Sequence, residues 1–524
     1  MLHMHLSIRL SSLCLAGLLL SPARGWAEPN AGDPPASSQA DASSRNKELA
    51  KKEKPKHPAG TIPDAKEKPV LTRNTVTIAG QHVSYVAETG MLPLLKPDGD
   101  LKASIFYVAY LKQGESRTER RPVTFCFNGG PGSSSVWLHL GALGPRRVQL
   151  SERDAAQPAP FGLADNEFSV LHVTDLVFID PVATGFSRPA EENKAEQFFG
   201  KSPDIESVGE FIRLWATRHD RWLSPKYVCG ESYGVFRAAG LAYHLHSHYG
   251  MSLDGLIFVS GLLDFAALSG DLSCQVLLPA YTAAAHFHKK LPPDLQADLP
   301  KALAEARQFM RTEYAMALFQ GAAMTAEQRA RVVAELSRLT GLPARVISDN
   351  DLRVDSATFR KELLHDEGLI LGRFDARVTG RDANAAAHYP GFDPSHSTID
   401  GAFSAAMNAY VRSELKFEDD LPYGILSSVS PWTFGPQGTD PSVTHEFASE
   451  MKENTRLRVL VLNGRCDLAC PVDSIRYSID HLHLDPAHRG RITYAEYEAG
   501  HMMYVNPPDL RKMQKDVERF LRPR

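Results

Sequence analysis

A serine stands in residues 230–234 (Gly-Glu-Ser-Tyr-Gly), directly after an apolar run that includes Cys229. The two glycines predict a tight turn between a strand and a helix, where neighbouring segments pack too closely for larger side chains. Such a turn exposes the serine hydroxyl, and the start of the helix supplies backbone N–H groups beside it. We therefore interpret Ser232 as a nucleophile; the alternative is an ordinary serine in a tight turn.

Two further side chains complete a possible acyl-transfer site. Asp467 follows an apolar run that ends at Asn463-Gly464, and His501 follows residues 494–500. Histidine, with a near-neutral pKa, takes the serine proton, while a carboxylate fixes the imidazole tautomer and stabilises the imidazolium. The order serine, aspartate, histidine is that of α/β-hydrolases, with both partners in loops after strands. Taken singly, Asp467 could be a turn residue and His501 a solvated histidine; together they predict a nucleophilic hydrolase.

A glycine-rich loop, residues 128–135 (Asn-Gly-Gly-Pro-Gly-Ser-Ser-Ser), follows the apolar run that ends at Phe127. It does not match a phosphate-binding loop, because it lacks the Gly-Lys-Ser/Thr ending and Pro131 interrupts the run of backbone N–H groups. In an α/β-hydrolase such a loop lends N–H groups to an oxyanion hole. The alternative is a simple tight turn after a strand.

The elements that must position these residues are short buried strands. Apolar runs end in turn residues and are followed by helical patterns at residues 123–127, 176–179, 256–259 and 459–462. Runs of this kind predict a largely parallel sheet with helices on both faces, which makes the fold class α/β. The active site of such a sheet lies beyond the carboxyl ends of its strands.

Between about residues 265 and 444 the pattern changes to alanine-rich helical stretches. Helices are predicted at residues 300–311 and 325–340, and strand signals are rare. We interpret this segment as a mostly helical cap inserted into the α/β core, where it shapes access to a pocket. The core itself is then split between residues 69–264 and 445–524.

The composition excludes some classes of function. The chain has 524 residues, a formal net charge of −4, 23% charged and 43% hydrophobic residues. These values are typical of a globular protein rather than a disordered or fibrous one. Nucleic acid is not expected as a partner, because phosphate binding needs a basic excess.

The N-terminal residues predict export. Residues 1–27 have Arg9 before an apolar run and a small-residue cleavage site at 25–27, which is typical of a secretory signal peptide. Residues 28–68 are rich in Pro, Ala, Ser and Lys and predict a flexible tail, with a lysine-mediated surface contact as the alternative. We expect an exported protein, either periplasmic or secreted, without stable membrane insertion.

Five cysteines remain after removal of the signal peptide. An odd number in an oxidising compartment leaves at least one free thiol, and their pairing cannot be read from the sequence. Cys126 and Cys229 lie in apolar runs and are expected to be buried, whereas Cys466 and Cys470 are close enough for a local disulfide. No metal site or other cofactor is expected, because paired cysteine and histidine spacing is missing.

Five motifs, in chain order, resemble those of the serine carboxypeptidases. They are residues 127–135, 180–187 (Asp-Pro-Val-Ala-Thr-Gly-Phe-Ser), 230–234, 463–467 (Asn-Gly-Arg-Cys-Asp) and 500–502 (Gly-His-Met). The resemblance extends from about residue 122 to the C-terminus. It implies an α/β-hydrolase fold and the removal of single C-terminal amino acids from peptides, best in acid.

The resemblance also implies roles for individual residues. The nucleophile, general base and orienting carboxylate would be Ser232, His501 and Asp467. The backbone N–H groups of the oxyanion hole would come from Gly130 and Tyr233, and the terminal carboxylate of the peptide would be held by Asn128, Gly129 and Glu231. Glu231 can bond a carboxylate only if the two share a proton, so its pKa must be raised by burial and like charge.

Departures from the family pattern leave the substrate open. Well-known members have a second acidic residue before Leu-Gly-Pro, whereas Ala142 precedes that sequence here. An esterase or acyltransferase on the same scaffold therefore remains an alternative, and an inactive binding protein is disfavoured because each catalytic position is filled. The sequence predicts a serine carboxypeptidase that acts on peptides through an acyl-enzyme; its oligomeric state is open.

Overall fold

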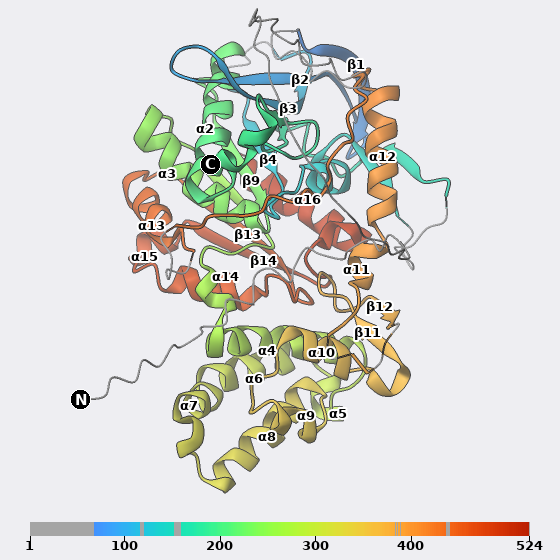
Figure 1. Cartoon of the computed structure of the whole chain (residues 1–524), viewed down its shortest axis with the longest axis vertical. Coiled ribbons are helices and arrows are strands. Elements are labelled where there is room, and N and C mark those ends of the chain that lie inside the picture. The colour runs from blue at the N-terminus through green and yellow to red at the C-terminus, as the bar shows by residue number, and fades with distance from the viewer. Residues whose placement is uncertain are drawn as a thin grey trace, which may run out of the picture. The chain divides into compact units, whose positions relative to one another are not determined.

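A ten-stranded sheet runs through the described part of the chain, with helices on both sides (Figure 1). The computed structural model describes residues 68–522 apart from 116–119, 151–158, 383, 385, 388 and 436–440. The strand order is β1-β2-β3-β7-β4-β9-β10-β13-β14, and β8 pairs with β3. The expected signal peptide at 1–27, and the expected tail up to residue 67, lie outside the described residues.

Neighbouring strands from β7 to β14 run parallel to one another. They are β4 (Val123–Phe127), β7 (Asp175–Ile179), β9 (Lys226–Glu231), β10 (Gly255–Val259), β13 (Arg458–Gly464) and β14 (Ile492–Tyr497). The predicted strands at 123–127, 176–179, 256–259 and 459–462 are confirmed within about two residues at each end. They were readable because parallel strands are covered on both faces and so form continuous apolar runs.

The other edge of the sheet is antiparallel. Its strands are β1 (Val70–Ile78), β2 (Gln81–Leu95), β3 (Leu101–Lys112) and the short β8 (Arg188–Pro189). Two separate hairpin-like sheets pair β5 (Arg146–Gln149) with β6 (Gly162–Asp165) and β11 (Leu369–Leu371) with β12 (Thr379–Arg381). None of these strands was predicted. The start of β2 alternates exposed and buried side chains, so it lacks a continuous apolar run.

Helices of at least two turns pack mainly against the sheet or against one another. Those near the sheet are α2 (Lys201–Arg218), α3 (Tyr233–Tyr249), α12 (Asp400–Ser413), α13 (Thr444–Glu453), α14 (Val472–Asp480) and α16 (Pro507–Leu521). Shorter ones are α1 (Val136–Leu138), the π-helix η3 (His139–Leu143), α11 (Pro394–Ser397) and α15 (Pro486–Arg489).

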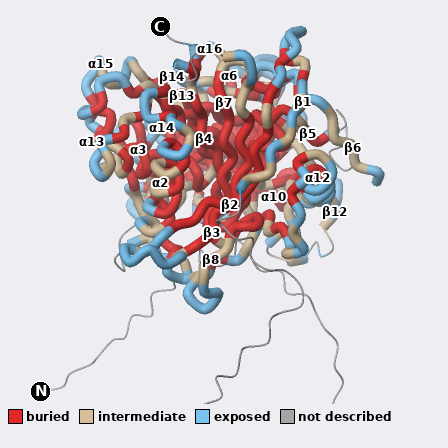
Figure 2. The backbone as a smooth tube through the Cα atoms, turned by 90° about the horizontal axis from the view of Figure 1, so that it is seen from above, coloured by how far each residue is buried: buried red, intermediate tan, exposed pale blue. Residues whose placement is uncertain are grey.

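Both faces of the parallel strands are buried, because alternate side chains point in opposite directions. Phe125 and Val228 belong to the core that contains residues of α2 and α3, whereas Cys126 and Cys229 belong to the core that contains residues of α12 and α16. Figure 2 shows these buried residues as a continuous block in the middle of the sheet. The site loops therefore project from a rigid base.

A group of helices between β10 and β13 forms its own hydrophobic core. It comprises α4 (Gly270–Phe287), α5 (Pro293–Gln296), α6 (Leu299–Arg311), α7 (Glu313–Gln320), α8 (Ala326–Thr340), α9 (Ala344–Asp349) and α10 (Ser356–Glu362). Helices α6 and α8 confirm the two predicted at 300–311 and 325–340. Later residues, including α12, pack into the core of the sheet instead. Where the cap begins and ends, near 265 and 444, stays a prediction.

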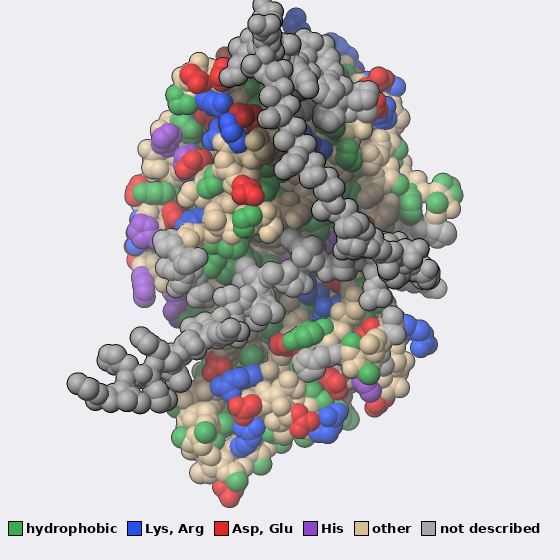
Figure 3. Space-filling model, in the orientation of Figure 1, with side chains coloured by type: hydrophobic (Ala, Val, Ile, Leu, Met, Phe, Trp, Pro, Cys, Tyr) green, Lys and Arg blue, Asp and Glu red, His purple; other side chains and the backbone are tan. Residues whose placement is uncertain are grey.

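Charged side chains attach this helical group to the sheet. Arg307 of α6 donates to Asp473 of α14 at 3.1 Å and to Glu496 of β14 at 3.0 Å. On the face drawn in Figure 3, basic and acidic side chains lie next to one another over the same helices. Their charges are therefore compensated locally.

Cysteines contribute to the cores as thiols. All five that the structure describes are free and buried, so Cys466 and Cys470 do not form a local disulfide. The burial predicted for Cys126 and Cys229 is confirmed, since both are 0% exposed.

Candidate active site

Asp467 and His501 meet beyond the carboxyl ends of β13 and β14. His501 Nδ1 donates a hydrogen bond to Asp467 Oδ2 at 2.8 Å, and both side chains are buried. The other oxygen, Oδ1, accepts from the backbone N–H groups of Ala469 and Cys470 at 2.7 and 2.9 Å. Burial lowers the His501 pKa, but the charge and hydrogen bond of Asp467 outweigh it, so the pKa is raised. This arrangement fixes the proton on Nδ1 and leaves Nε2 free to accept one.

Ser232 occupies the turn between β9 and α3. Its φ of +60° is in the left-handed region, and its N–H donates to Val259 O at 3.0 Å. A Cβ on Gly230 would lie 2.1 Å from the carbonyl oxygen of Gly234, so the turn closes only with glycine. Burial raises the pKa of the Cys470 thiol, and Ser232 is close enough to act on that pKa in the opposite direction. Ser232 therefore meets the loop that carries Asp467.

The glycine-rich loop after β4 passes directly over the start of α3. A Cβ on Gly129 would lie 2.4 Å from the backbone nitrogen of Tyr233. Gly130 has a φ of +99°, which L-residues with side chains rarely adopt. The segments that carry the Gly130 and Tyr233 N–H groups are thus brought together at the Ser232 turn.

A buried ion pair holds this loop from behind. Arg237 of α3 donates through Nε to Asp204 and through Nη1 to the carbonyl oxygen of Asn128, both at 2.7 Å. The Asn128 side-chain oxygen accepts from Leu138 N at 3.1 Å, so the amide NH₂ is the group of this side chain that acts on Glu231. Asn128 is therefore fixed at both its backbone and its side chain.

Glu231, the residue before the serine, is a buried carboxyl. It accepts a hydrogen bond from the Tyr504 hydroxyl at 2.7 Å and is in contact with the Asn128 side chain. Burial raises its pKa to about 7, although the charge of His501 and the hydrogen bonds of Tyr504 and Asn128 act in the opposite direction. The carboxyl therefore keeps a proton up to near-neutral pH, which a second carboxylate can share.

Comparison with known proteins identifies the family. A model of the serine carboxypeptidases matches residues 81–506. The chain belongs to the serine carboxypeptidase family. Among curated relatives, serine carboxypeptidase-like 16 of Arabidopsis thaliana is 30% identical over 151 residues, 28% of this chain and 32% of the relative. Serine carboxypeptidase-like 10 of the same plant is 28% identical over 134 residues, 25% of this chain and 28% of the relative. The chain thus spans about a third of the length of these relatives.

A solved structure shares the fold. Kex1(delta)p, a prohormone-processing carboxypeptidase from Saccharomyces cerevisiae, superposes with a TM-score of 0.50 at 17% identity. The match covers 83% of this chain and 91% of that one. The predicted α/β-hydrolase fold and the resemblance to serine carboxypeptidases are both confirmed.

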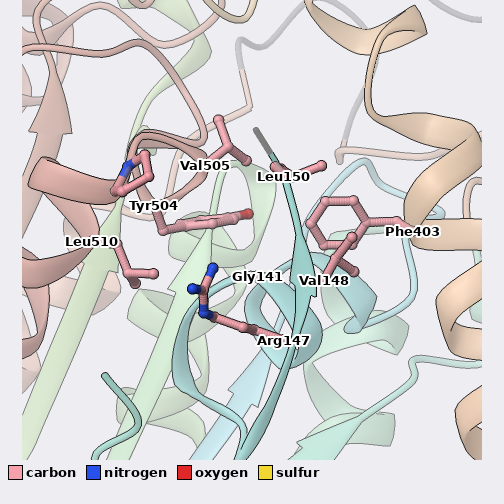
Figure 4. A pocket seen from close by; sticks show the side chains of 9 residues that line it. Gly141, Arg147, Val148, Leu150, Phe403, Tyr504, Val505 and Leu510 are labelled. Carbon is pink, nitrogen blue, oxygen red and sulfur yellow. The ribbon is translucent and has the colours of Figure 1, made fainter. Parts of the chain in front are cut away.

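Two small residues, Gly141 and Ala142, stand in the π-helix η3. Ala142 is 1% exposed, and a Cβ on its neighbour Gly141 would lie 2.6 Å from the Tyr504 ring. Gly141 and Tyr504 line a small pocket together with Phe403 and Leu510, and Figure 4 shows the Tyr504 ring among these side chains. The Tyr504 ring thus packs against Gly141 while its hydroxyl donates to Glu231.

The loop between β11 and β12 adds residues near His501 that the sequence did not reveal. Phe374, in the loop between β11 and β12, stacks on the His501 ring with centroids 4.9 Å apart and planes 13° apart. Its carbonyl oxygen accepts from His501 N at 2.5 Å. A Cβ on Gly500 would lie 2.0 Å from that oxygen, so the glycine before His501 was the available signal. Arg373 lies beside Phe374, with its guanidinium 5.0 Å from the ring.

In the part of the chain that the structure describes, no group of three or more His, Cys, Asp or Glu is arranged to hold a metal ion. Over residues 68–522, outside the gaps noted above, no helix is both long and apolar enough to cross a membrane.

Proposed function

We propose that this protein is an exported serine-type carboxypeptidase that releases C-terminal amino acids from peptides. The observation that carries the proposal is the buried Glu231 carboxyl, with a pKa of about 7, next to Ser232. Together with Asn128 and Gly129 it can receive the terminal carboxylate of a peptide by sharing a proton. Family membership and the Asp467–His501 hydrogen bond support the same function.

The proposed reaction proceeds through an acyl-enzyme. Ser232 Oγ attacks the last peptide carbonyl while His501 Nε2 takes its proton, and Asp467 stabilises the imidazolium. The N–H groups of Gly130 and Tyr233 bind the oxyanion. Collapse of the tetrahedral intermediate breaks the C–N bond, and His501 returns the proton to the leaving amine. Water then hydrolyses the Ser232 ester by the same steps, which restores the enzyme.

Release of an amino acid from an N-blocked dipeptide at pH 5 and pH 7 tests the proposal. We expect release at both values, with a lower KM at pH 5 because Glu231 then carries its proton. Ser232→Ala should lower kcat by at least about 10⁴-fold without changing the thermal unfolding midpoint. The matched control is Ser247→Ala, an exposed serine of α3. Full activity of the Ser232 variant would show that the nucleophile is wrong.

A second candidate function is supported by Ala142. Without an acidic residue at this position, selection for a free terminal carboxylate rests on Glu231, Asn128 and Gly129. An esterase would hydrolyse esters of the same blocked amino acids, and an acyltransferase would transfer the acyl group of those esters to another acceptor. Neither would release an amino acid from the dipeptides at either pH. That result would replace the carboxypeptidase proposal.

A further inference from the structure

Arg373 brings a positive charge from the helical segment to the catalytic histidine. Its guanidinium lies 5.0 Å from the centre of the Phe374 ring, and that ring stacks on the His501 imidazole with centroids 4.9 Å apart. Its backbone is held on both sides: its N–H donates to Asp393 Oδ1 at 3.0 Å, and its carbonyl oxygen accepts from Leu468 N at 3.1 Å. The residue is half-buried, so part of it remains exposed to solvent.

This charge is not neutralised where it lies. Among the ion pairs of the described residues, none involves the Arg373 guanidinium. Asp393 uses Oδ1 for the backbone N–H of Arg373 and for the N–H and hydroxyl of Ser395. A second arginine, Arg360, lies within electrostatic reach and donates to the carbonyl oxygens of Leu371 and Phe392. Arg360 thus adds positive charge to this region, where Asp393 and Asp382 are within its electrostatic reach.

The sheet order indicates which part of a substrate would meet Arg373. Ser232 follows β9; Asn128 follows β4 on one side of it, and Cys470 belongs to the loop after β13 on the other. The proposed site for the terminal carboxylate is therefore on the β4 side. The charge of Arg373 is within electrostatic reach of Cys470 and His501, so it lies on the β13 side. A peptide that crosses Ser232 would direct its acyl part there.

We propose that Arg373 is a specificity-determining residue that binds an anionic side chain on the acyl side of the scissile bond. Substrates with Asp or Glu as the residue before the released amino acid would then be preferred. The fork of guanidinium donors suits a carboxylate, and the Phe374 ring holds its plane. This inference rests on the proposed function for the direction in which the peptide lies.

Matched substrates that differ in one charge test it. They are N-blocked Glu-Leu and Gln-Leu, together with the p-nitrophenyl esters of N-blocked Gln and of N-blocked Glu with its side chain free. We expect kcat/KM to favour Glu by about tenfold in both pairs. Arg373→Gln should remove the preference, and Arg373→Lys should keep part of it. Arg381→Gln, an exposed arginine of β12, is the matched control and should change neither ratio.

The outcomes separate this inference from the proposed function. If the dipeptides are not cleaved but the esters are, the carboxypeptidase proposal fails and the Glu/Gln ester ratio still tests Arg373. Turnover of the Gln substrates by Arg373→Gln reports that the variant is folded. Equal Glu and Gln rates in the wild type, or an unchanged ratio in Arg373→Gln, would overturn the inference. An equal rise of KM for both dipeptides, with both esters unaffected, would overturn it by assigning Arg373 to the terminal carboxylate.

Discussion

Two buried glutamate–tyrosine pairs occupy different regions of the sheet. At the candidate active site, the Tyr504 hydroxyl donates to Glu231 at 2.7 Å. In the antiparallel part, the Tyr107 hydroxyl of β3 donates to Glu88 of β2 at 2.6 Å. Both carboxyls are almost completely buried, with 2% and 7% exposure. The local chemistry is therefore nearly the same, yet the two pKa values move in opposite directions.

The difference is a cation that belongs to one pair alone. His219 donates through Nε2 to Glu88 at 2.8 Å, and its Nδ1 lies 2.9 Å from the carbonyl oxygen of Trp215. A carbonyl and an ionised carboxylate both only accept, so Nδ1 donates to Trp215 and Nε2 donates to Glu88. Burial raises the Glu88 pKa, but the hydrogen bond and charge of His219, with the bond from Tyr107, lower it overall.

Glu231 has no such partner, because the nearby imidazole of His501 is bonded to Asp467. Burial is then the largest influence on Glu231, and it raises the pKa of the carboxyl to about 7. The comparison teaches that hydrogen bonds from Tyr504 and Asn128 do not keep a buried carboxyl ionised without a hydrogen-bonded histidine such as His219. Leaving Glu231 without its own cation is what lets it hold a proton for an incoming carboxylate.

The largest effect is expected from Glu88→Gln, which replaces the buried carboxylate that accepts from His219 and Tyr107 with a neutral amide. The free energy of unfolding should fall by about 2–3 kcal/mol at pH 7, while kcat/KM for an N-blocked dipeptide stays unchanged. Because the Glu88 pKa is lowered in the fold, the wild type loses this stability as the pH falls below the ordinary glutamate range, and the two proteins converge there. Urea unfolding at pH 7 and pH 3.5 measures the difference.

Glu231→Gln is the matched variant at the site and should behave in the opposite way. A pKa raised in the fold means that the wild type loses stability as the pH rises from about 4.5 to about 7. The variant should therefore be no less stable than the wild type at pH 8. A loss at pH 8 comparable to that of Glu88→Gln would show that Glu231 is ionised like Glu88.

The next largest effect is expected on the pH dependence of KM for a peptide substrate. The protonated fraction of a group with a pKa of about 7 falls roughly tenfold between pH 6 and pH 8. The wild-type KM for an N-blocked dipeptide should rise by about this factor, while KM for the corresponding ester, which has no terminal carboxylate, should not. In Glu231→Gln, KM for the dipeptide should change less than about twofold over the same range. An unchanged tenfold rise in the variant would assign the pH dependence to another group.

The sequence predicted the parallel strands far better than the antiparallel ones. Strands such as β4 and β10 are apolar on both faces because helices cover both, so each forms a continuous apolar run that predicts a strand. Strand β2 mixes exposed and buried positions in its first half, and its pairing with β3 depends on contacts that no short window contains. The helices α6 and α8 were readable from their alanine-rich, periodic composition.

The residues of the candidate site also differ in how readily the sequence indicates them. Ser232, Asp467 and His501 stand in loops next to predicted strands and in recognisable motifs, so the sequence alone was enough to propose them. Tyr504 and Arg373 reach the site through tertiary packing, one from behind Glu231 and the other from the helical segment. Their side chains belong to no local sequence pattern. Gly141 leaves room for the Tyr504 ring, and Gly500 leaves room for the carbonyl oxygen of Phe374, the neighbour of Arg373.

The smallest effect is expected from the two tyrosine hydroxyls. Tyr504→Phe removes a donor that favours the charged form of Glu231, so the pKa of Glu231 should rise further. The pH at which the dipeptide KM begins to increase should then move upward by about half a pH unit, with kcat at pH 6 nearly unchanged. Tyr107→Phe removes the same hydroxyl from Glu88 and is the matched control, because its pair lies away from Ser232 and should leave the profile where it is. A downward shift in Tyr504→Phe would contradict the assignment of this hydroxyl as a donor to Glu231, since losing a donor cannot make a carboxyl more acidic.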